Sequence, residues 1–285
     1  MAKILVTGAN GQLGKELQDV EGQYSKFKFV FFDRQILDIT NREKVIEAFE
    51  EIKPEYVLNC AAFTAVDKAE TEVEAAMLVN RDAAANLAAA SAANGARFLH
   101  ISTDYVFDGT STSPLKEDYP TNPVNTYGKS KLEGEQSIAK LNKDAVIIRT
   151  SWMYSTHGNN FVKTMLRLMA SRPEVSVVGD QIGSPTYAAD LANAIIRIVG
   201  SGMWIPGIYH FSNDAAVTWH DFASEIKRRS GAACLVRAIT TDQYPTPAKR
   251  PKFSVMDKSK IHRTYSIEIK DWRESLEVCL DKFIQ

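Results

Sequence analysis

The sequence predicts an α/β protein, a doubly wound parallel sheet with a smaller α/β lobe beside it. Short apolar runs alternate with helical patterns as far as Thr150, which is typical of strands joined by crossover helices. A glycine-rich turn joins the first apolar run to the first helix, and the later segments alternate less regularly. We therefore expect a first domain over residues 1–150 and a lobe made mainly of residues 151–285, with segments near 180–205 returning to the first domain.

The first elements place the glycine-rich turn between a strand and a helix. Residues 4–6 are apolar, as in a strand buried on both faces of a sheet. Gly8, Gly11 and Gly14 then form a GxxGxxG pattern that opens a helix. Such glycines let the backbone turn tightly and approach a pyrophosphate at the helix N-terminus. The pattern predicts a Rossmann-like dinucleotide-binding domain.

The second apolar run, residues 29–32, ends at Asp33, nineteen residues after Gly14. A dinucleotide fold has an acid at this spacing for the adenosine ribose hydroxyls. Arg34 follows, and an arginine at this place can accept a 2′-phosphate. Asp33 favours NADH and Arg34 favours NADPH, so we expect either cofactor to be used. The alternative interpretation of this pair is a solvated turn.

The next elements continue the alternation. Residues 40–43 read as a capping box before a helix, and Asp38 and Ile39 precede it where an adenine edge would lie. Residues 56–62 predict a strand that ends in small residues, and residues 71–94 predict one long helix closed by Gly95. Residues 98–102 predict a further strand. Because ligands bind beyond the carboxyl ends of parallel strands, Thr103 and Asp104 should share one rim with the glycines.

Residues 107–125 form a long loop rich in proline and polar residues, and a helix follows it. Residues 145–150 predict a strand, and residues 175–178 predict a shorter one. Further helices are expected at residues 161–170, 187–199, 218–230 and 271–283.

Tyr127 and Lys131 open the helix after the long loop. They are four residues apart, so both side chains project from one helix face. An ammonium beside a phenol lowers the pKa of the phenol, and the pair could protonate an alkoxide formed by hydride transfer. On its own the motif is more commonly a solvated surface.

Bulk properties exclude several classes of protein. The net charge of -1 and the absence of a basic block argue against a nucleic-acid partner. Three scattered cysteines suggest neither a disulfide framework nor a metal site. No apolar run reaches the length of a membrane span, and no signal peptide precedes the first strand, so we expect a cytoplasmic protein without a membrane partner.

Taken together, these residues resemble those of the extended short-chain dehydrogenase/reductases, and within them the dTDP-4-dehydrorhamnose reductase family. The Tyr/Lys pair and the glycines are common to the superfamily, whereas two other segments are particular to the reductases. These are residues 65–70 (AVDKAE) and Thr150-Ser151-Trp152. Further similar segments are residues 59–64, 102–107 and 180–186 and Arg250-Pro251.

The resemblance implies NAD(P)H-dependent reduction of the 4-keto group of a dTDP-sugar. Tyr127 would donate the proton, Lys131 would hold the nicotinamide ribose, and Thr103 would bind the oxygen on which charge develops. Asp104 and Trp152 would contact the nucleotide-sugar together with Thr103. The cofactor-binding residues would be Gly8, Asn10, Gly11, Gln12, Leu13, Gly14, Asp33, Arg34, Asp38, Ile39, Ala61, Ala62, Phe63, Thr64, Tyr127 and Lys131.

Members of this family have been described with Mg²⁺ bridging a homodimer. Glu16 fits one ligand position, but Ala189 stands where a second acid is needed, which makes the metal bridge doubtful. We assign no metal ligands and leave Mg²⁺ and a homodimer as open alternatives. Two alternatives to the reductase also stay open. One is a nucleotide-sugar epimerase or dehydratase, for which Asp104 could serve as an acid. The other is a non-catalytic NADP-binding regulatory subunit.

Several remaining residues have a structural interpretation. His100 is expected to be a core residue, and His157 shows no spacing shared with acids. Trp204, Trp219 and Trp272 are expected to anchor the packing of the lobe. Arg250 suits either a diphosphate or a surface salt bridge.

Overall fold

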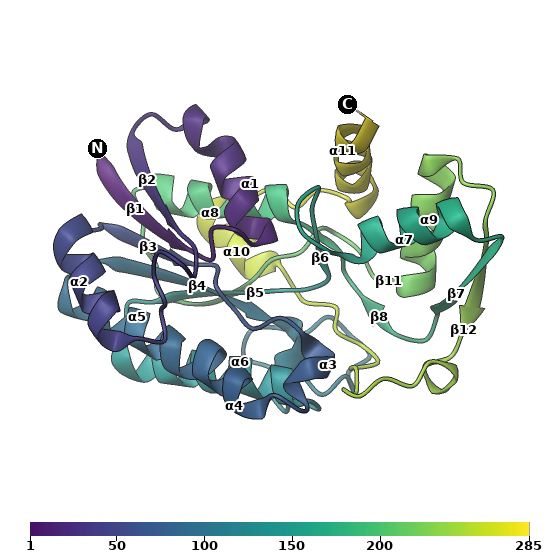
Figure 1. The fold of residues 1–285 in the computed structure, drawn as a ribbon, viewed down its shortest axis with the longest axis horizontal. Coiled ribbons are helices and arrows are strands. Elements are labelled where there is room, and N and C mark those ends of the chain that lie inside the picture. Colours follow the sequence, from purple (N-terminus) through teal and green to yellow (C-terminus); the bar gives the residue numbers. More distant parts are fainter. Residues whose placement is uncertain (285) are drawn as a thin grey trace.

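The computed structural model describes residues 1–284 and centres on a six-stranded parallel sheet (Figure 1). The strand order is β10-β5-β4-β3-β1-β2. The strands are β1 (Ala2–Thr7), β2 (Phe27–Phe32), β3 (Tyr56–Asn59), β4 (Arg97–Thr103), β5 (Val146–Thr150) and β10 (Gly207–His210). The chain leaves β1 for β2 on one side and then crosses to β3 on the other. The crevice beyond the carboxyl ends of β1 and β3 is therefore the topological switch point, where such sheets bind ligands.

Helices cover both faces of this sheet, so the doubly wound α/β prediction is confirmed (Figure 1). One face carries α1 (Gln12–Val20), α8 (Ala188–Gly200) and α10 (Ser259–Tyr265), and the other carries α2 (Arg42–Ile52), α5 (Ala84–Ala93) and α6 (Thr126–Leu141). Along β1, Ile4 and Val6 join the first apolar cluster while Leu5 joins the second. Strand side chains alternate between faces, and both faces here are buried, which explains the uninterrupted apolar runs.

A second group of elements packs beside the carboxyl ends of the sheet (Figure 1). In it β7 pairs with β12, β6 with β9, and β8 with β11. Its members are β6 (Met153–Tyr154), α7 (Phe161–Ser171), β7 (Glu174–Val178), β8 (Ile182–Gly183), β9 (Thr186–Tyr187), β11 (Val217–Thr218), α9 (Trp219–Ser230), β12 (Leu235–Ile239) and α11 (Trp272–Ile284). Phe222 and Trp272 lie in its own apolar cluster.

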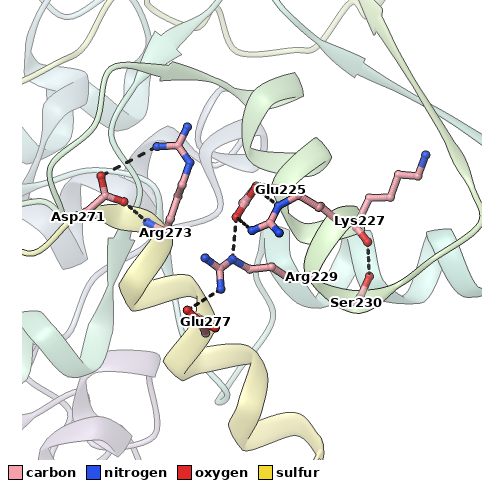
Figure 2. Close-up of polar contacts among 8 residues, drawn as sticks. Glu225, Lys227, Arg229, Ser230, Asp271, Arg273 and Glu277 are labelled. Carbon is pink, nitrogen blue, oxygen red and sulfur yellow. Dashed lines mark hydrogen bonds and ion pairs between the residues drawn. The ribbon is translucent and has the colours of Figure 1, made fainter.

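An ionic cluster ties α11 to α9 at the edge of this lobe (Figure 2). The Arg229 guanidinium lies 2.7 Å from Glu225 on its own helix and 2.7 Å from Glu277 on α11. Because Arg229 bridges two helices, it fixes the C-terminal helix against the lobe.

Two local expectations need correction. The predicted helix over residues 71–94 is divided into α4 (Val73–Met77), a π-helical turn (Leu78–Ala83) and α5, after the short α3 (Val66–Ala69). Asn41, rather than Thr40, caps α2 by accepting hydrogen bonds from the N–H groups of Glu43 and Lys44. Short 3-10 turns occupy Glu21–Gln23, Asp104–Val106 and Thr241–Gln243. Within residues 1–284 the structure contains no helix of the length and apolarity that a membrane crossing requires.

Candidate active site

A cavity of about 820 Å³ opens at the switch point and extends to the second lobe. This volume is that of a small-molecule site. Most of the residues predicted for the cofactor and substrate line it: Gly8, Asn10, Gly11, Gln12, Leu13, Asp33, Arg34, Asp38, Ile39, Ala61, Ala62, Phe63, Thr64, Thr103, Asp104, Tyr127, Lys131 and Trp152. Gly14 is the exception. A Cβ atom there would collide with the Gly8 carbonyl oxygen and the Ala9 backbone, so Gly14 allows the turn to pack on α1 rather than contacting a ligand.

The glycine turn presents backbone donors to this cavity. Gly8 has φ +71°, and a Cβ atom there would lie 2.6 Å from the Ala61 nitrogen, so only glycine fits between the tips of β1 and β3. Gly11 is the N-cap of α1, and no side chain of residues 1–284 caps this helix end. The free N–H groups and the helix dipole suit a phosphate or pyrophosphate.

The acid after β2 faces the same cavity. Asp33 accepts a 2.7 Å hydrogen bond from the Asn10 amide and further bonds from the backbone N–H groups of Gln35 and Ile36. Arg34 is exposed at the cavity rim. Among residues 1–284 it has no ion-pair partner. The structure therefore presents a carboxylate and a guanidinium side by side at the cavity rim.

The start of α6 is held at two points. Glu70 accepts hydrogen bonds from the Thr126 backbone N–H at 2.8 Å and from its hydroxyl at 3.0 Å. Asn125 caps the helix through the Gly128 N–H at 2.7 Å. These bonds fix the first turn of α6, which carries Tyr127 into the cavity.

Lys131 is buried in the cavity wall, and Tyr127 beside it is half-buried. Burial raises the pKa of Tyr127 to about 12, while the neighbouring Thr103 hydroxyl works against this rise. Lys131 Nζ donates to the Ile101 carbonyl at 2.6 Å and lies 3.0 Å from His100 Nε2. Burial lowers the pKa of Lys131 to about 8. The expectation that Lys131 lowers the Tyr127 pKa does not hold for this state, because burial outweighs any nearby charge and Tyr127 remains a neutral phenol.

Sequence reasoning missed two residues behind this pair. His100 is fully buried as expected, but its ring also contacts the Lys131 amine. Asn80, in the π-helical turn, bonds both backbone groups of Phe63 and donates to the Ser130 hydroxyl at 2.9 Å. Asn80 thus ties the loop after β3 to α6, and such π turns are frequent at functional sites.

The side of the cavity next to the second lobe holds a buried acid and two tryptophans. Burial raises the pKa of Asp104 to about 7, while a hydrogen bond from the Thr103 hydroxyl lowers it. Trp152 has φ +45° and stacks on Trp219 with ring centroids 3.5 Å apart. Trp219 also lines the cavity, so it is more than the packing anchor that we expected. Trp272 packs in the lobe core, whereas Trp204 packs against Tyr56 of the sheet.

Arg250 is engaged in an ion pair rather than free to bind a phosphate. Its Nη2 atom donates to Asp67 Oδ2 at 2.8 Å, and its Nη1 atom donates to Asp67 Oδ1 and the Ala248 carbonyl. This pairing lowers the pKa of Asp67. The bidentate pair is a salt bridge, which was one of the two expectations for Arg250, and it joins α3 to the loop before α10.

Outside the cavity, His157 lies next to two acidic residues, which its position in the sequence did not predict. Glu16 is fully buried and accepts from Ser155, while His157 Nε2 lies 2.7 Å from Asp19. One donor atom each from Glu16, Asp19 and His157 lies within 4.8 Å of the others. Oxygen and imidazole donors of this kind bind divalent cations.

Comparisons with known proteins agree with this geometry. A dTDP-4-dehydrorhamnose reductase of Aggregatibacter actinomycetemcomitans is 43% identical, over 97% of this chain and 98% of that protein. A crystal structure of a dTDP-4-dehydrorhamnose reductase from Clostridium acetobutylicum has a TM-score of 0.95 and 43% identity, over 99% of this chain and 100% of that one. One from Bacillus anthracis in complex with NADP has a TM-score of 0.95 and 40% identity, with the same coverage.

The family described as "RmlD substrate binding domain" matches residues 2–285. With a match of this extent and relatives above 40% identity over nearly the whole chain, this protein belongs to that family.

Proposed function

We propose that this chain is a dTDP-4-dehydrorhamnose reductase, which reduces the 4-keto group of dTDP-4-dehydro-L-rhamnose to give dTDP-L-rhamnose. The observation that carries the proposal is that Thr103, Tyr127 and Lys131 share one cavity with the glycine turn. The relatives that match over nearly the full chain are named for this reaction.

We propose that residues 1–150, with α8 and β10, bind the cofactor, and that the remaining residues bind most of the sugar nucleotide. The uncapped N-terminus of α1 fits the pyrophosphate, and Asp33 fits the ribose hydroxyls. Arg34 at the cavity rim has the charge that suits a 2′-phosphate, which supports the use of both NADPH and NADH. When bound, the nicotinamide supplies the hydride.

The residues around the substrate ketone then donate the proton and stabilise the developing negative charge. With a pKa of about 12, Tyr127 is protonated at neutral pH and is ready to act as a general acid toward the substrate oxygen. Thr103 offers a hydroxyl to the same oxygen, where negative charge develops. Proton donation of this type contributes about 10²- to 10⁴-fold in rate. Trp152 and Trp219 form a flat apolar wall for the sugar nucleotide.

Asp104 gives a specific reason to keep a second candidate. A dehydratase or epimerase needs an acid or base beside the reacting sugar, and an Asp104 pKa of about 7 suits such a group. These enzymes recycle their cofactor, whereas a reductase consumes one NAD(P)H for each sugar. Stoichiometry therefore separates the two candidates.

The deciding experiment follows NADPH absorbance with dTDP-4-dehydro-L-rhamnose for the wild type and Tyr127→Phe. We expect stoichiometric oxidation by the wild type and a loss of about 10²-fold or more in kcat for the variant. Tyr154→Phe is the control, because Tyr154 is buried outside the cavity and its hydroxyl has no partner among residues 1–284. Cofactor binding without turnover would point to the regulatory-subunit alternative, and full activity of Tyr127→Phe would refute the assignment of the acid.

We further propose a cytoplasmic enzyme whose partner is the dTDP-sugar, without a nucleic-acid or membrane partner. A net charge of -1 with no basic block supports this. Whether it forms a homodimer is open to measurement by sedimentation.

A further inference from the structure

The segment over residues 248–257 connects parts of the cavity wall that lie far apart in the sequence. On one side it pairs with β8, where the Ile182 N–H donates to the Lys252 carbonyl at 2.8 Å. On the other side it pairs with the long loop before α6, where the Leu115 N–H donates to the Val255 carbonyl at 2.9 Å. The segment therefore joins the second lobe to the loop that leads into α6.

The first residues of this segment are anchored on α3 and α6. Arg250 forms the bidentate pair with Asp67, and the Ala248 N–H donates to Asp67 Oδ1 at 3.1 Å. The Lys249 carbonyl accepts a 2.8 Å hydrogen bond from the side-chain amide of Asn125, which is the N-cap of α6. Three successive residues thus hold the segment against α3 and against the start of the helix that carries the proposed acid.

Two residues of the segment lie behind groups that line the cavity. Burial raises the pKa of Asp104, and the buried Ser254 hydroxyl beside it opposes this rise. Burial likewise raises the pKa of Tyr105, and the nearby Arg250 guanidinium opposes it. Tyr105 lines the cavity, and its ring lies edge-on to that of Tyr127 with 5.8 Å between the centroids. Ser254 and Arg250 lie outside the cavity lining, so they can act on a ligand only through such neighbours.

The strand on the other side of the segment supports the tryptophan wall formed by Trp152 and Trp219. β8 ends at Gly183, where a Cβ atom would lie 2.6 Å from Trp152 Cε2, so the indole packs directly on the strand backbone. β8 also pairs with β11, which ends immediately before Trp219. A shift of segment 248–257 would therefore move the tryptophan wall relative to Tyr127.

We propose that Asp67 and Arg250 are positioning residues, whose ion pair anchors segment 248–257 so that the tryptophan wall and Tyr127 keep their places around one cavity. The proposal rests on the proposed reductase function, in which the sugar ketone lies between these groups. A misplacement of about 1 Å caused far from the chemistry can cost 10²-fold in rate. The ion pair should therefore affect the reaction of the sugar without contacting it.

Binding of the cofactor should not depend on the ion pair. The glycine turn and Asp33 are the groups proposed for the pyrophosphate and the ribose. Within residues 1–284 neither forms a hydrogen bond with segment 248–257. The proposal thus predicts a change in kcat and in the KM for the sugar, together with an unchanged Kd for NADPH.

The first test compares Arg250→Met with Arg229→Met. The two arginines are matched, because their side chains are 18% and 16% exposed and each joins two separate segments through ion pairs. Arg229 lies at the edge of the second lobe, outside the cavity (Figure 2). We expect Arg250→Met to lower kcat by about 10- to 100-fold while the Kd for NADPH, titrated by its fluorescence without sugar, stays unchanged. We expect Arg229→Met to lower only stability. A wild-type kcat in Arg250→Met, or an equal loss in Arg229→Met, would overturn the proposal.

A double-mutant cycle asks whether the two residues act as a unit. We expect Asp67→Asn, Arg250→Met and the double variant to lose similar factors in kcat. Losses that multiply would show that the residues act independently, which would contradict the proposal. If Arg250→Met fails to fold, Arg250→Lys replaces it, because lysine keeps the charge but cannot form the bidentate pair. A smaller loss in kcat is then expected, and full activity would refute the positioning role.

The third test does not depend on turnover. The Gly128 N–H donates to the side chain of Asn125, so its exchange with deuterium reports how firmly the start of α6 is capped. We expect faster exchange over residues 125–130 in Arg250→Met and wild-type exchange there in Arg229→Met. Unchanged exchange in Arg250→Met would overturn the proposal even in a fully active reductase. Faster exchange in a protein without turnover would refute the proposed function and leave the anchoring role of the pair standing.

Discussion

Glu135→Gln tests how α6 is held against the sheet. Glu135 and Arg149 each have side chains only 3% exposed, and they form a bidentate pair at 2.9 and 2.7 Å. Ser102 also donates to Glu135 Oε1. Glutamine keeps the volume of the side chain but removes its charge. Its NH₂ group would also face the Arg149 guanidinium, and because both groups can only donate, one hydrogen bond is lost. The substitution therefore leaves Arg149 as a buried cation without a counter-ion.

The cost of breaking such a buried pair on one side is about 3–5 kcal/mol. Urea denaturation followed by far-UV circular dichroism should show this as a lower midpoint, and thermal unfolding should shift by roughly 6–10 °C. Glu174→Gln is the control, because Glu174 pairs with Arg237 where both side chains are exposed by 39% and 62%. Exposed pairs contribute about 1 kcal/mol or less.

A double variant separates the ion pair from the packing. Glu135→Gln combined with Arg149→Met removes both charges, so we expect it to recover part of the stability lost by Glu135→Gln alone. If Glu135→Gln costs no more than Glu174→Gln, the pair does not hold α6, and the reasoning is wrong.

Three further predictions concern the cavity. Arg34→Ala should raise the KM for NADPH by about 10- to 100-fold and leave NADH kinetics unchanged, since one charge-assisted contact is lost; equal effects on both cofactors would contradict the assignment. Trp219→Ala should raise the KM for the dTDP-sugar by roughly 2- to 10-fold, with the NADPH KM as the internal control. Asp104 keeps its proton up to about pH 7 in the native state, whereas the unfolded chain releases it near pH 4. Wild type should therefore lose stability relative to Asp104→Asn as pH rises between these values, by up to about 4 kcal/mol, and parallel urea midpoints across pH 4–7 would disprove this.

The elements whose residues form a recognisable local pattern could be predicted from the sequence. The first five strands of the sheet follow from apolar runs, and Gly8 and Gly11 follow from their spacing. In contrast, β6, β8, β9 and β11 have two residues each, too few to form a periodic pattern. β10 was also missed, because four residues become a strand only when β5 supplies their hydrogen bonds.

The missed site residues share one physical reason. Asn80 contacts Phe63 and Ser130, and His100 contacts Asn59 and Lys131. Most of these partners lie 30 to 50 residues away in the sequence. Neither residue carries a local signature, and a histidine inside a strand pattern favours a core interpretation. A π-helical turn likewise leaves no mark in an alanine-rich helical pattern.

The sheet acquires its last strand late in the order of synthesis. β5 ends at Thr150, but β10, which pairs with it, begins at Gly207. Proteins are made from the N-terminus at about 5–20 residues per second, so a growing chain carries β5 as an uncovered sheet edge for roughly 3–12 seconds. An exposed edge strand of this kind can pair with another chain. Ribosome-bound chains that end between these strands are therefore the stage at which aggregation and chaperone binding should concentrate.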